Sequence, residues 1–340
     1  MEVLPTITVR KYKKEDKEIW DDFIDHSKNS TFLFKRDFMD YHKDRYRDCS
    51  LMVFENNLPI AALPAHRFDN NTIASHFGLS YGGIILRKTE TLHKTLQIVY
   101  KILYVLKSNN IEKIIYKSFH KFYNSIGSEE ITYAKYLIKA KLTVRQFSSV
   151  INLNDKLEMN RTRLRLARRA LKMGVIIKEV DSFDDYWNSV LIPNLKNKYE
   201  AKPAHTVEEI TKLHKSFPKN IRQFNAYLND SIVAGATIFE TANVVRVQYN
   251  SANEEGRSSG ASDLLYLELI ERYFKNKNYF DFGTSFDANG LNLGLLNWKE
   301  SFGARAFSID TFEIETKNFI LLEKSINCDN GKLVQNYHHH

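Results

Sequence analysis

The sequence has few of the features that mark secreted or membrane proteins. Its two cysteines, Cys49 and Cys328, are far apart and make no disulfide framework, which is typical of a reducing compartment. The longest apolar run, residues 96–106, is interrupted by Lys101 and is too short to span a bilayer. The first residues are charged and lack the apolar core of a signal peptide. We therefore expect a cytoplasmic protein without membrane insertion.

The composition is that of a globular protein with a basic surface. With 340 residues and 43% hydrophobic residues, the chain is long enough for two domains with real cores. The net charge of +8 favours anionic partners such as phosphates, nucleic acid or acidic lipid headgroups, without choosing among them. We expect His338–His340 to be the remains of a purification tag.

Both halves of the sequence have the same order of expected elements. In each half a strand is followed by two helices, three strands, a helix, a strand, a helix and a final strand. Agreement over a whole series of elements indicates a duplicated unit. The sequence therefore predicts an α/β fold of two tandem domains, residues 1–155 and 156–330, each a mostly antiparallel mixed sheet flanked by helices.

A basic helix, Glu158–Met173, connects the two predicted domains and ends at Gly174, a natural C-terminal cap. The helical period places its side chains on two faces. The basic face carries Arg161, Arg165, Arg168 and Lys172, and the apolar face carries Leu164, Ala167 and Leu171. We interpret the basic face as solvated. The alternative is that it binds an anionic ligand: a nucleotide diphosphate, an acyl carrier protein or tRNA.

A candidate phosphate site lies between a predicted strand, Val244–Asn250, and a predicted helix, Ser262–Lys275. A helix start offers unpaired backbone N–H groups and the positive end of the helix dipole, which suit a pyrophosphate. Gly260 and the small residues after it would let phosphate oxygens approach the backbone, and Arg257 would add a charged contact. The competing interpretation is an ordinary turn with a small N-cap residue.

The segment resembles the GNAT acyltransferase superfamily, whose pyrophosphate loop reads Q/R-x-x-G-x-G/A. Arg257 and Gly260 match, and Ser262 departs from the final Gly or Ala. Two fused copies and the run W-K-E-S-F-G resemble the Fem-type subgroup with its F-K-x-x-F-G signature, although Trp298 replaces Phe. The resemblance implies acyl-CoA as co-substrate and no metal. The coenzyme A contacts it implies are Val247, Gln248, Tyr249, Arg257, Ser259, Gly260, Ala261 and Ser262.

The first half has no such glycine turn, so the sequence predicts one coenzyme A site, in the second half. In GNAT proteins the acyl arm lies where the fourth and fifth strands diverge, which here are Val244–Asn250 and Tyr279–Ser285. Strand alternation places Val247 and Tyr249 on one face, and Gln248 and Asn250 on the other. The backbone N–H groups near residues 247–249 are the oxyanion candidates.

Acyl transfer to an amine needs a proton acceptor and a proton source for the leaving thiolate. We favour His205 as general base, with Asp281 as the alternative, and Tyr249 or Ser285 as proton donor. The site would equally work with water and no protein base. The candidates for substrate binding are Tyr199, Lys202, His205, Arg246, Trp298 and Lys299.

The motif run K-P-A-H-T, Q-Y-N-S, F-D-F-G-T-S and N-W-K-E-S-F-G-A resembles FdhC-type nucleotide-linked amino-sugar N-acyltransferases. The resemblance implies transfer from acyl-CoA to a dTDP- or UDP-linked amino sugar for O-antigen or capsule synthesis. The alternative is a Fem-type, aminoacyl-tRNA-dependent transferase acting on a peptidoglycan precursor. A nucleic-acid or anion-binding module is a third interpretation, but no recognised motif appears. We expect no nucleic acid partner except tRNA under the alternative, and a monomer or homodimer.

Overall fold

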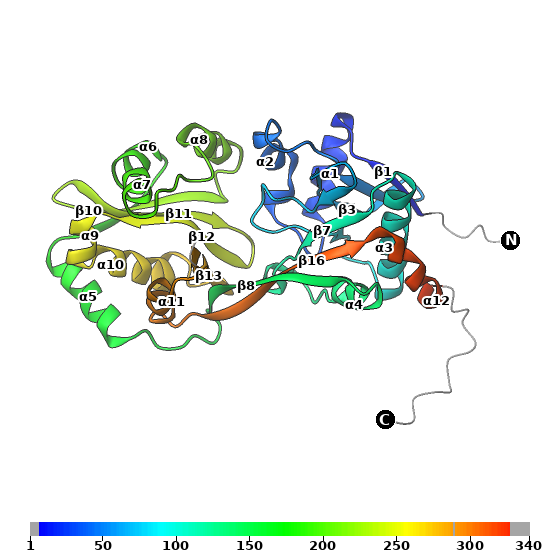
Figure 1. Ribbon diagram of the computed structural model, residues 1–340. Helices are drawn as coiled ribbons and strands as arrows, with labels where there is room; N and C mark the ends of the chain where they lie inside the picture. Colours follow the sequence, from blue (N-terminus) through cyan, green and yellow to red (C-terminus); the bar gives the residue numbers. More distant parts are fainter. Residues whose placement is uncertain (1–6, 288–289, 327–340) are drawn as a thin grey trace, which may run out of the picture. The chain divides into compact units, whose positions relative to one another are not determined.

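The computed structural model describes residues 7–287 and 290–326, without the side chains of residues 198 and 199 (Figure 1). Contacts divide the chain into two units. Unit 1 contains the residues up to Arg145 and those from Asp310 onward, and unit 2 is Gln146–Ile309. Both Cys328 and the expected tag remnant, His338–His340, lie outside the described residues.

The strands are β1 (Ile7–Lys11), β2 (Leu51–Glu55), β3 (Leu58–Leu63), β4 (His66–Arg67), β5 (Thr72–Ala74), β6 (Ile85–Leu86), β7 (Lys113–Lys117), β8 (Lys141–Asn152), β9 (Ile176–Val180), β10 (Ile221–Leu228), β11 (Ser231–Glu240), β12 (Val244–Ala252), β13 (Tyr279–Thr284), β14 (Phe286–Asp287), β15 (Gly290–Leu291) and β16 (Arg305–Glu315).

The α-helices are α1 (Lys17–Asp25), α2 (Arg36–Met39), α3 (Leu92–Ser108), α4 (Glu130–Leu137), α5 (Arg161–Lys172), α6 (Asp184–Tyr186), α7 (Ile192–Tyr199), α8 (Val207–Ser216), α9 (Glu254–Ser259), α10 (Ala261–Glu268), α11 (Leu293–Glu300) and α12 (Glu323–Ile326). Two π-helical turns, η5 (Trp187–Leu191) and η6 (Leu269–Tyr273), follow α6 and α10. Short 3-10 turns are η1 (Lys14–Asp16), η2 (Phe32–Phe34), η3 (Asp40–His42), η4 (Lys121–Tyr123) and η7 (Thr316–Leu322).

Unit 1 contains an antiparallel sheet in the order β1-β2-β3-β6 and a second run in the order β4-β5-β7-β16-β8. In the second run β5 and β7 are parallel, and β7 and β16 are antiparallel. Helix α3 packs on this unit through an apolar face that includes Leu96, Val99 and Leu103, as its spacing predicts. Its N-cap is Thr91, whose hydroxyl accepts a hydrogen bond from the backbone N–H of Lys94.

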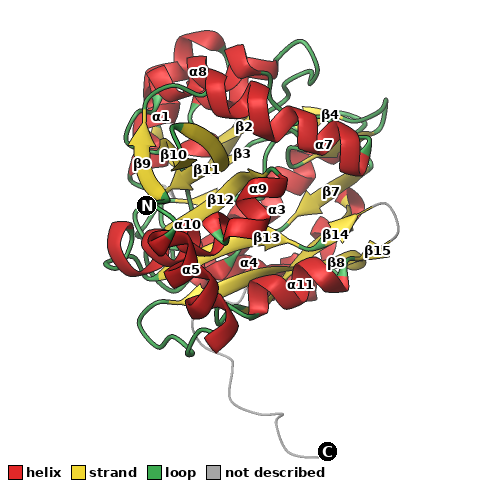
Figure 2. Ribbon diagram, turned by 90° about the vertical axis from the view of Figure 1, so that its left-hand side faces the viewer, coloured by secondary structure: helices red, strands yellow, loops and turns green. Residues whose placement is uncertain are grey.

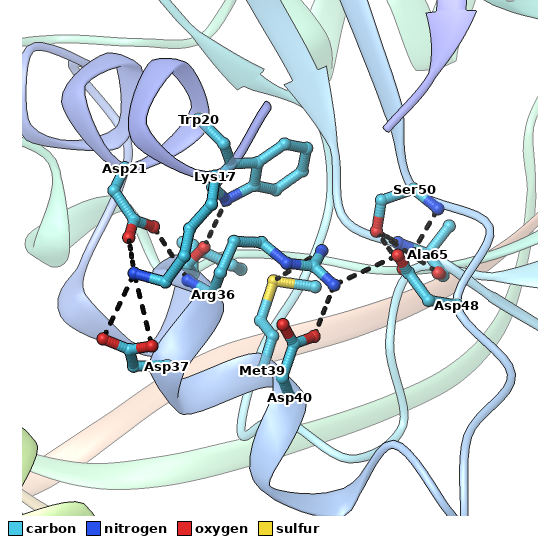
Figure 3. Close-up of polar contacts among 11 residues, drawn as sticks. Lys17, Trp20, Asp21, Arg36, Asp37, Met39, Asp40, Asp48, Ser50 and Ala65 are labelled. Atoms are coloured by element: carbon cyan, nitrogen blue, oxygen red, sulfur yellow. Dashed lines mark hydrogen bonds and ion pairs between the residues drawn. The ribbon is translucent and has the colours of Figure 1, made fainter. Parts of the chain in front are cut away.

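A buried arginine ties together the first helices of unit 1 (Figure 3). Arg36 is 2% exposed, and its guanidinium donates to Asp40 at 2.5 Å and to Asp48 at 3.1 Å. It also lies over the ring of Tyr12, with 3.9 Å from Cζ to the ring centroid. Because a buried charge is costly unless it is paired, these contacts are what allow a cation at this place in the core.

Unit 2 contains a sheet in the order β8-β13-β12-β11-β10-β9. Its pairs are antiparallel except β12 with β13, which run parallel. Helices α6, α7 and α8 lie on one face of this sheet, and α5 and α10 lie side by side on the other (Figures 1 and 2). The core on the α10 side gathers Val247, Leu265, Tyr266, Phe282 and Phe302.

The order of elements repeats in the two halves of the chain, and the mixed α/β architecture confirms the predicted fold class. In unit 1 the parallel pair is β5 with β7, and in unit 2 it is β12 with β13. One feature differs from a simple tandem arrangement. The last strand of the first half, β8, pairs with β13 in unit 2, and the last strand of the second half, β16, pairs with β7 in unit 1.

This exchange of strands explains why the units differ from the predicted ranges, 1–155 and 156–330. Residues 146–155 belong to unit 2, and the chain from Asp310 onward belongs to unit 1. Strand periodicity identifies β8 and β16 as strands but carries no information on the partner of either one.

Candidate functional site

The site in unit 2 is built on β12, which separates from β13 partway along its length. The two strands pair only over residues 244–246 and 279–281, and beyond Arg246 no described strand pairs with this edge of β12. On the other edge, the register with β11 shifts between Val247 and Tyr249, so that Gln248 is an extra residue in β12. A bulge of this kind bends a strand and changes the direction of its side chains.

The bulge overturns one prediction made from strand alternation. Val247 packs in the core with Tyr266 and Phe282, whereas the ring of Tyr249 packs against Trp187 at 4.8 Å between centroids. The two residues therefore lie on opposite faces, and the prediction that they share one is wrong. The physical reason is that the extra residue, Gln248, shifts the alternation by one position.

Tyr249, which is half-buried, and His205, which is buried, form a pair on the face that α6, α7 and α8 cover. Nδ1 of His205 is 2.5 Å from the phenol oxygen of Tyr249, which also accepts a hydrogen bond from the backbone N–H of His205 at 3.2 Å. His205 is 6% exposed and sits one residue before Thr206, the N-cap of α8. Burial raises the pKa of Tyr249 to about 12, so this phenol is neutral at physiological pH.

Asp281 is the centre of a second polar group, where β12 and β13 diverge. Its carboxylate is fully buried and accepts hydrogen bonds from Nη1 of Arg246 at 2.6 Å and from the backbone N–H of Gly283 at 2.8 Å. The hydroxyl of Ser148, on β8, donates to the same carboxylate. These contacts compensate the negative charge of the buried carboxylate. They therefore directly support a structural role for Asp281.

Lys299, on α11, reaches the same turn of β13. Its Nζ donates to the carbonyl oxygens of Gly283 at 3.0 Å and of Thr284 at 2.6 Å, and the residue is 2% exposed. Burial lowers the pKa of this ammonium group to about 8. Ser285, which follows Thr284, is fully buried, and its hydroxyl has no hydrogen-bond partner among the described residues.

The predicted phosphate segment is helical. Asn253 caps α9 through the N–H of Gly256, and Arg257 lies within α9, where its guanidinium donates to the carbonyl of Ala252. Gly260 has φ +85° and joins α9 to α10. A Cβ on Gly260 would lie 2.5 Å from the carbonyl oxygen of Leu166, on α5. Close packing of two helices therefore requires this glycine, independently of any ligand.

The other predicted residues are distributed as follows. Ser259 and Ala261 are buried beside Gly260, and Ser262 is half-buried in the first turn of α10. Trp298 packs in the core against Tyr266, with 5.0 Å between centroids. Lys202 is exposed in the loop before α8. Tyr199 is the last residue of α7, and its side chain lies outside the described part of the chain.

Three residues of the site were not predicted. Besides Ser148, these are Trp187 and Thr237, and Nε1 of Trp187 donates to the hydroxyl of Thr237 at 3.1 Å. The Thr237 hydroxyl in turn donates to Gln223 at 2.7 Å. A single tryptophan or threonine carries no local signal of such a role. Only the pairing of β11 with Tyr249 brings this buried network beside the His205 pair.

Comparison with known proteins places this site in a known fold. Residues 160–300 match the family described as Acetyltransferase (GNAT) domain. No curated protein matches the sequence. Among solved structures, FemX has a TM-score of 0.65 at 10% identity, covering 94% of this chain and 99% of that one. The chain has a tandem GNAT-type fold.

Two further structures have the same architecture. A tandem GNAT protein from the clavulanic acid biosynthesis pathway has a TM-score of 0.52 at 9% identity, covering 92% of this chain and 99% of that one. L-PGS from Bacillus licheniformis has a TM-score of 0.57 at 9% identity, covering 92% and 96%. At such identities the likeness concerns the fold.

Within residues 7–287 and 290–326, no group of histidine, cysteine and carboxylate side chains is arranged to hold a metal ion. Over the same residues, no helix combines the length and the apolar character that crossing a bilayer requires.

Proposed function

We propose that the chain is an N-acyltransferase that moves an acyl group from acyl-CoA to the amino group of a dTDP- or UDP-linked amino deoxysugar. The observation that carries the proposal is the separation of β12 from β13 at a bulge, next to buried polar side chains. This arrangement offers an extended acyl arm a strand edge with which no described strand pairs beyond Arg246. The motif run around His205 and Lys299 supports an amino-sugar acceptor.

In this proposal the thioester carbonyl of the donor is bound by backbone N–H groups of residues 247–249. Backbone donors in a water-poor site stabilise the negative charge that develops on the carbonyl oxygen. The acceptor nitrogen attacks the carbonyl carbon, the bond from carbon to sulfur breaks, and the thiolate takes up a proton. No metal is needed for these steps.

His205 is the proposed acceptor of the proton from the attacking amine. Tyr249 binds Nδ1 and so fixes the orientation of the imidazole ring, with the proton transferred at Nε2. Tyr249 is also the proposed proton donor to the thiolate, because its raised pKa keeps the phenol protonated. Lys299 holds the turn at Gly283 through two carbonyl oxygens and so maintains the gap between the strands.

The predicted contact of the coenzyme A pyrophosphate with residues 257–262 stays part of the proposal. A substitution at Gly260 would not test it, because a side chain there meets the carbonyl of Leu166. Arg257→Gln is the better variant, since Arg257 lies at the surface of α9 and carries the charge. We expect Arg257→Gln to weaken CoA binding roughly tenfold, as for the loss of one charge-assisted contact.

The decisive experiment is mass spectrometry of the products formed from a panel of acyl-CoAs and nucleotide amino sugars. A second set of reactions replaces acyl-CoA with aminoacyl-tRNA and the sugar with a peptidoglycan precursor. Acylated nucleotide sugar in the first set alone is the expected result. Product in the second set alone would replace the proposal with a Fem-type transferase, and acylation of neither acceptor would refute the choice of substrate class.

A further inference from the structure

Unit 2 has a pocket of about 750 Å³ beside the basic helix α5. Its wall is formed by the loop before α5, by α5 itself and by the end of α10 with η6. Ile151, Ile270 and Phe302, each at most 1% exposed, close its base, and the more accessible apolar side chains of the lining include Leu157, Met159 and Leu164. A volume of this size suits a ligand of ordinary small-molecule dimensions.

One wall of the pocket is the loop before α5, which packs closely at Gly303. A Cβ on Gly303, which has φ +93°, would lie 2.7 Å from the carbonyl oxygen of Leu157. The loop therefore approaches the Phe302–Gly303 turn closely, and the backbone N–H of Asn160 donates to the carbonyl of Ser301 at 2.8 Å. Leu157 is left 49% exposed on the pocket wall, although it is a large apolar side chain.

Two arginines of α5 line the pocket without a carboxylate partner. Arg161 and Arg168 make no ion pair with any described residue, whereas Arg163 of the same helix is paired with Asp263 at 2.6 Å. The two arginines are seven residues apart, with Leu164 between them in the sequence. At this spacing they share one face of α5. They are about 10 Å apart along the axis, and their long side chains allow both guanidinium groups to approach one anion.

The side chains of the lining also indicate the chemical character of the ligand. Among the described residues that line the pocket there is no amide or hydroxyl side chain. The polar side chains of the lining are all charged, which favours a charged ligand over a neutral one. The two carboxylates of the lining are Glu271, paired with Lys156 at 2.5 Å, and Glu158, which has no ion-pair partner among the described residues.

We infer that this pocket binds an anionic amphiphile, a molecule with one apolar chain and a phosphate head. The chain lies against Leu157, Met159 and Leu164, and the phosphate binds Arg161 and Arg168. This inference is independent of the acyl-transfer site, which lies at β12 and β13. Under this inference the basic face of α5 binds a ligand and is not only solvated.

The test is calorimetric titration of the full chain with dodecyl phosphate below its micelle concentration. We expect the double variant Arg161→Gln/Arg168→Gln to bind roughly tenfold more weakly or worse, as for the loss of charge-assisted contacts. The matched control is Arg165→Gln/Arg169→Gln, which removes the same charge from α5 at two exposed residues outside the lining. The control should retain the affinity of the unaltered protein to within about twofold.

Two more variants test each part of the ligand separately. Glu158→Gln should tighten binding, because it removes a like charge from the rim. Leu164→Trp should fill part of the pocket and weaken the binding of dodecyl phosphate, with circular dichroism melting to confirm the fold. The arginine variants, whose side chains are exposed, keep the test valid if Leu164→Trp unfolds.

The source of the amphiphile is distinguished by sedimentation with vesicles. Sedimentation with phosphatidylglycerol vesicles but not with phosphatidylcholine, lost in the Arg161/Arg168 variant, would identify a membrane lipid as the ligand. Binding of dodecyl phosphate without sedimentation would identify a free single-chain amphiphile. The inference is wrong if dodecyl phosphate does not bind, or if the two double variants bind it equally.

Discussion

At the scale of single residues, the site combines the hydrogen-bonded pair His205 and Tyr249 with the ion pair Arg246 and Asp281. His205 and Tyr249 meet through a short hydrogen bond, and Tyr249 is neutral at physiological pH. Arg246 and Asp281 meet as ions, one of them fully buried. The pair His205 and Tyr249 is the better candidate for moving protons, since its groups gain or lose a proton without breaking an ion pair.

The charged pair should behave as a unit in stability measurements. We expect Asp281→Asn to lower the free energy of unfolding by about 3 kcal/mol, because it leaves Arg246 without its buried counter-charge. Arg246→Gln should cost a similar amount, and the double variant less than the sum. Urea denaturation of the three variants measures this coupling. Strictly additive losses would show that the ion pair does not act as a unit.

The role of the pair His205 and Tyr249 should be measurable in enzyme kinetics. Once activity is established, we expect His205→Asn to lower kcat by roughly 100-fold with little change in the KM for acyl-CoA, as for the loss of a general base. Tyr249→Phe keeps the ring packing on Trp187 and removes the hydroxyl, so it tests the orientation of His205 separately. Steady-state kinetics across pH would measure both. Full turnover by His205→Asn would remove the residue as base.

At the scale of elements, the backbone geometry of α9, α10 and β12 shapes the site. A bulge at Gln248 turns Tyr249 toward His205, and a glycine with positive φ joins two helices where a phosphate loop was expected. A glycine is needed at position 260 for two reasons. Its φ is positive, and a side chain there would meet the backbone of Leu166. The two effects can be measured separately, because Gly174 of unit 2 has a positive φ but no close contact.

We expect Gly260→Ala to lower the free energy of unfolding by clearly more than Gly174→Ala. Both residues have positive φ, +85° and +83°, so both variants incur conformational strain of about 1 kcal/mol. Only at Gly260 would the added Cβ also meet a backbone oxygen, whereas nothing lies within 4 Å of a Cβ on Gly174. Chemical denaturation of the two variants gives the difference. Equal losses would show that the contact with Leu166 relaxes without cost.

At the scale of the whole molecule, unit 1 contains a histidine cluster that has no part in the proposed reaction. His42, His66 and His76 are buried around Tyr46, with centroids 5.1 Å apart for His66 and His76. Burial lowers the pKa of His66 to about 4 and that of His76 to about 2. Both imidazoles are therefore neutral in the folded protein at physiological pH.

This cluster should make the folded state sensitive to acid. The folded-state pKa values lie below the unfolded value of about 6.5, so the unfolded chain takes up protons first. Stability is then complete above about pH 6.5 and falls toward pH 4, by up to about 1.4 kcal/mol per pH unit for each histidine. Denaturant unfolding at several pH values measures the slope, and hydrogen exchange locates it in unit 1. His76→Asn, which tolerates the positive φ of +86°, should reduce the slope. An unchanged slope would exclude the cluster as its cause.

Periodicity and turn residues were sufficient for the order of the elements in both halves, because these signals are local. Helix α3 follows from its apolar spacing, and α5 from its alternating basic and apolar faces. The basic helix was nevertheless misjudged in detail: Ala167 and Ala170 are its buried residues, and Leu171 is 64% exposed. Where a helix packs depends on its partner, here α10, and not on its own sequence alone.

The sequence supplies candidate residues for the site, whose roles stay predictions, and the structure supplies their geometry. Residue types and motif spacing pointed to His205, Tyr249, Asp281 and Lys299, which are local properties of the chain. Long-range pairing decided the rest: the bulge opposite β11 that sets the face of Tyr249, the exchange of β8 and β16, and the approach of α5 to Gly260. Each depends on contacts between residues far apart in the chain, whose free energy has no signature in any local pattern.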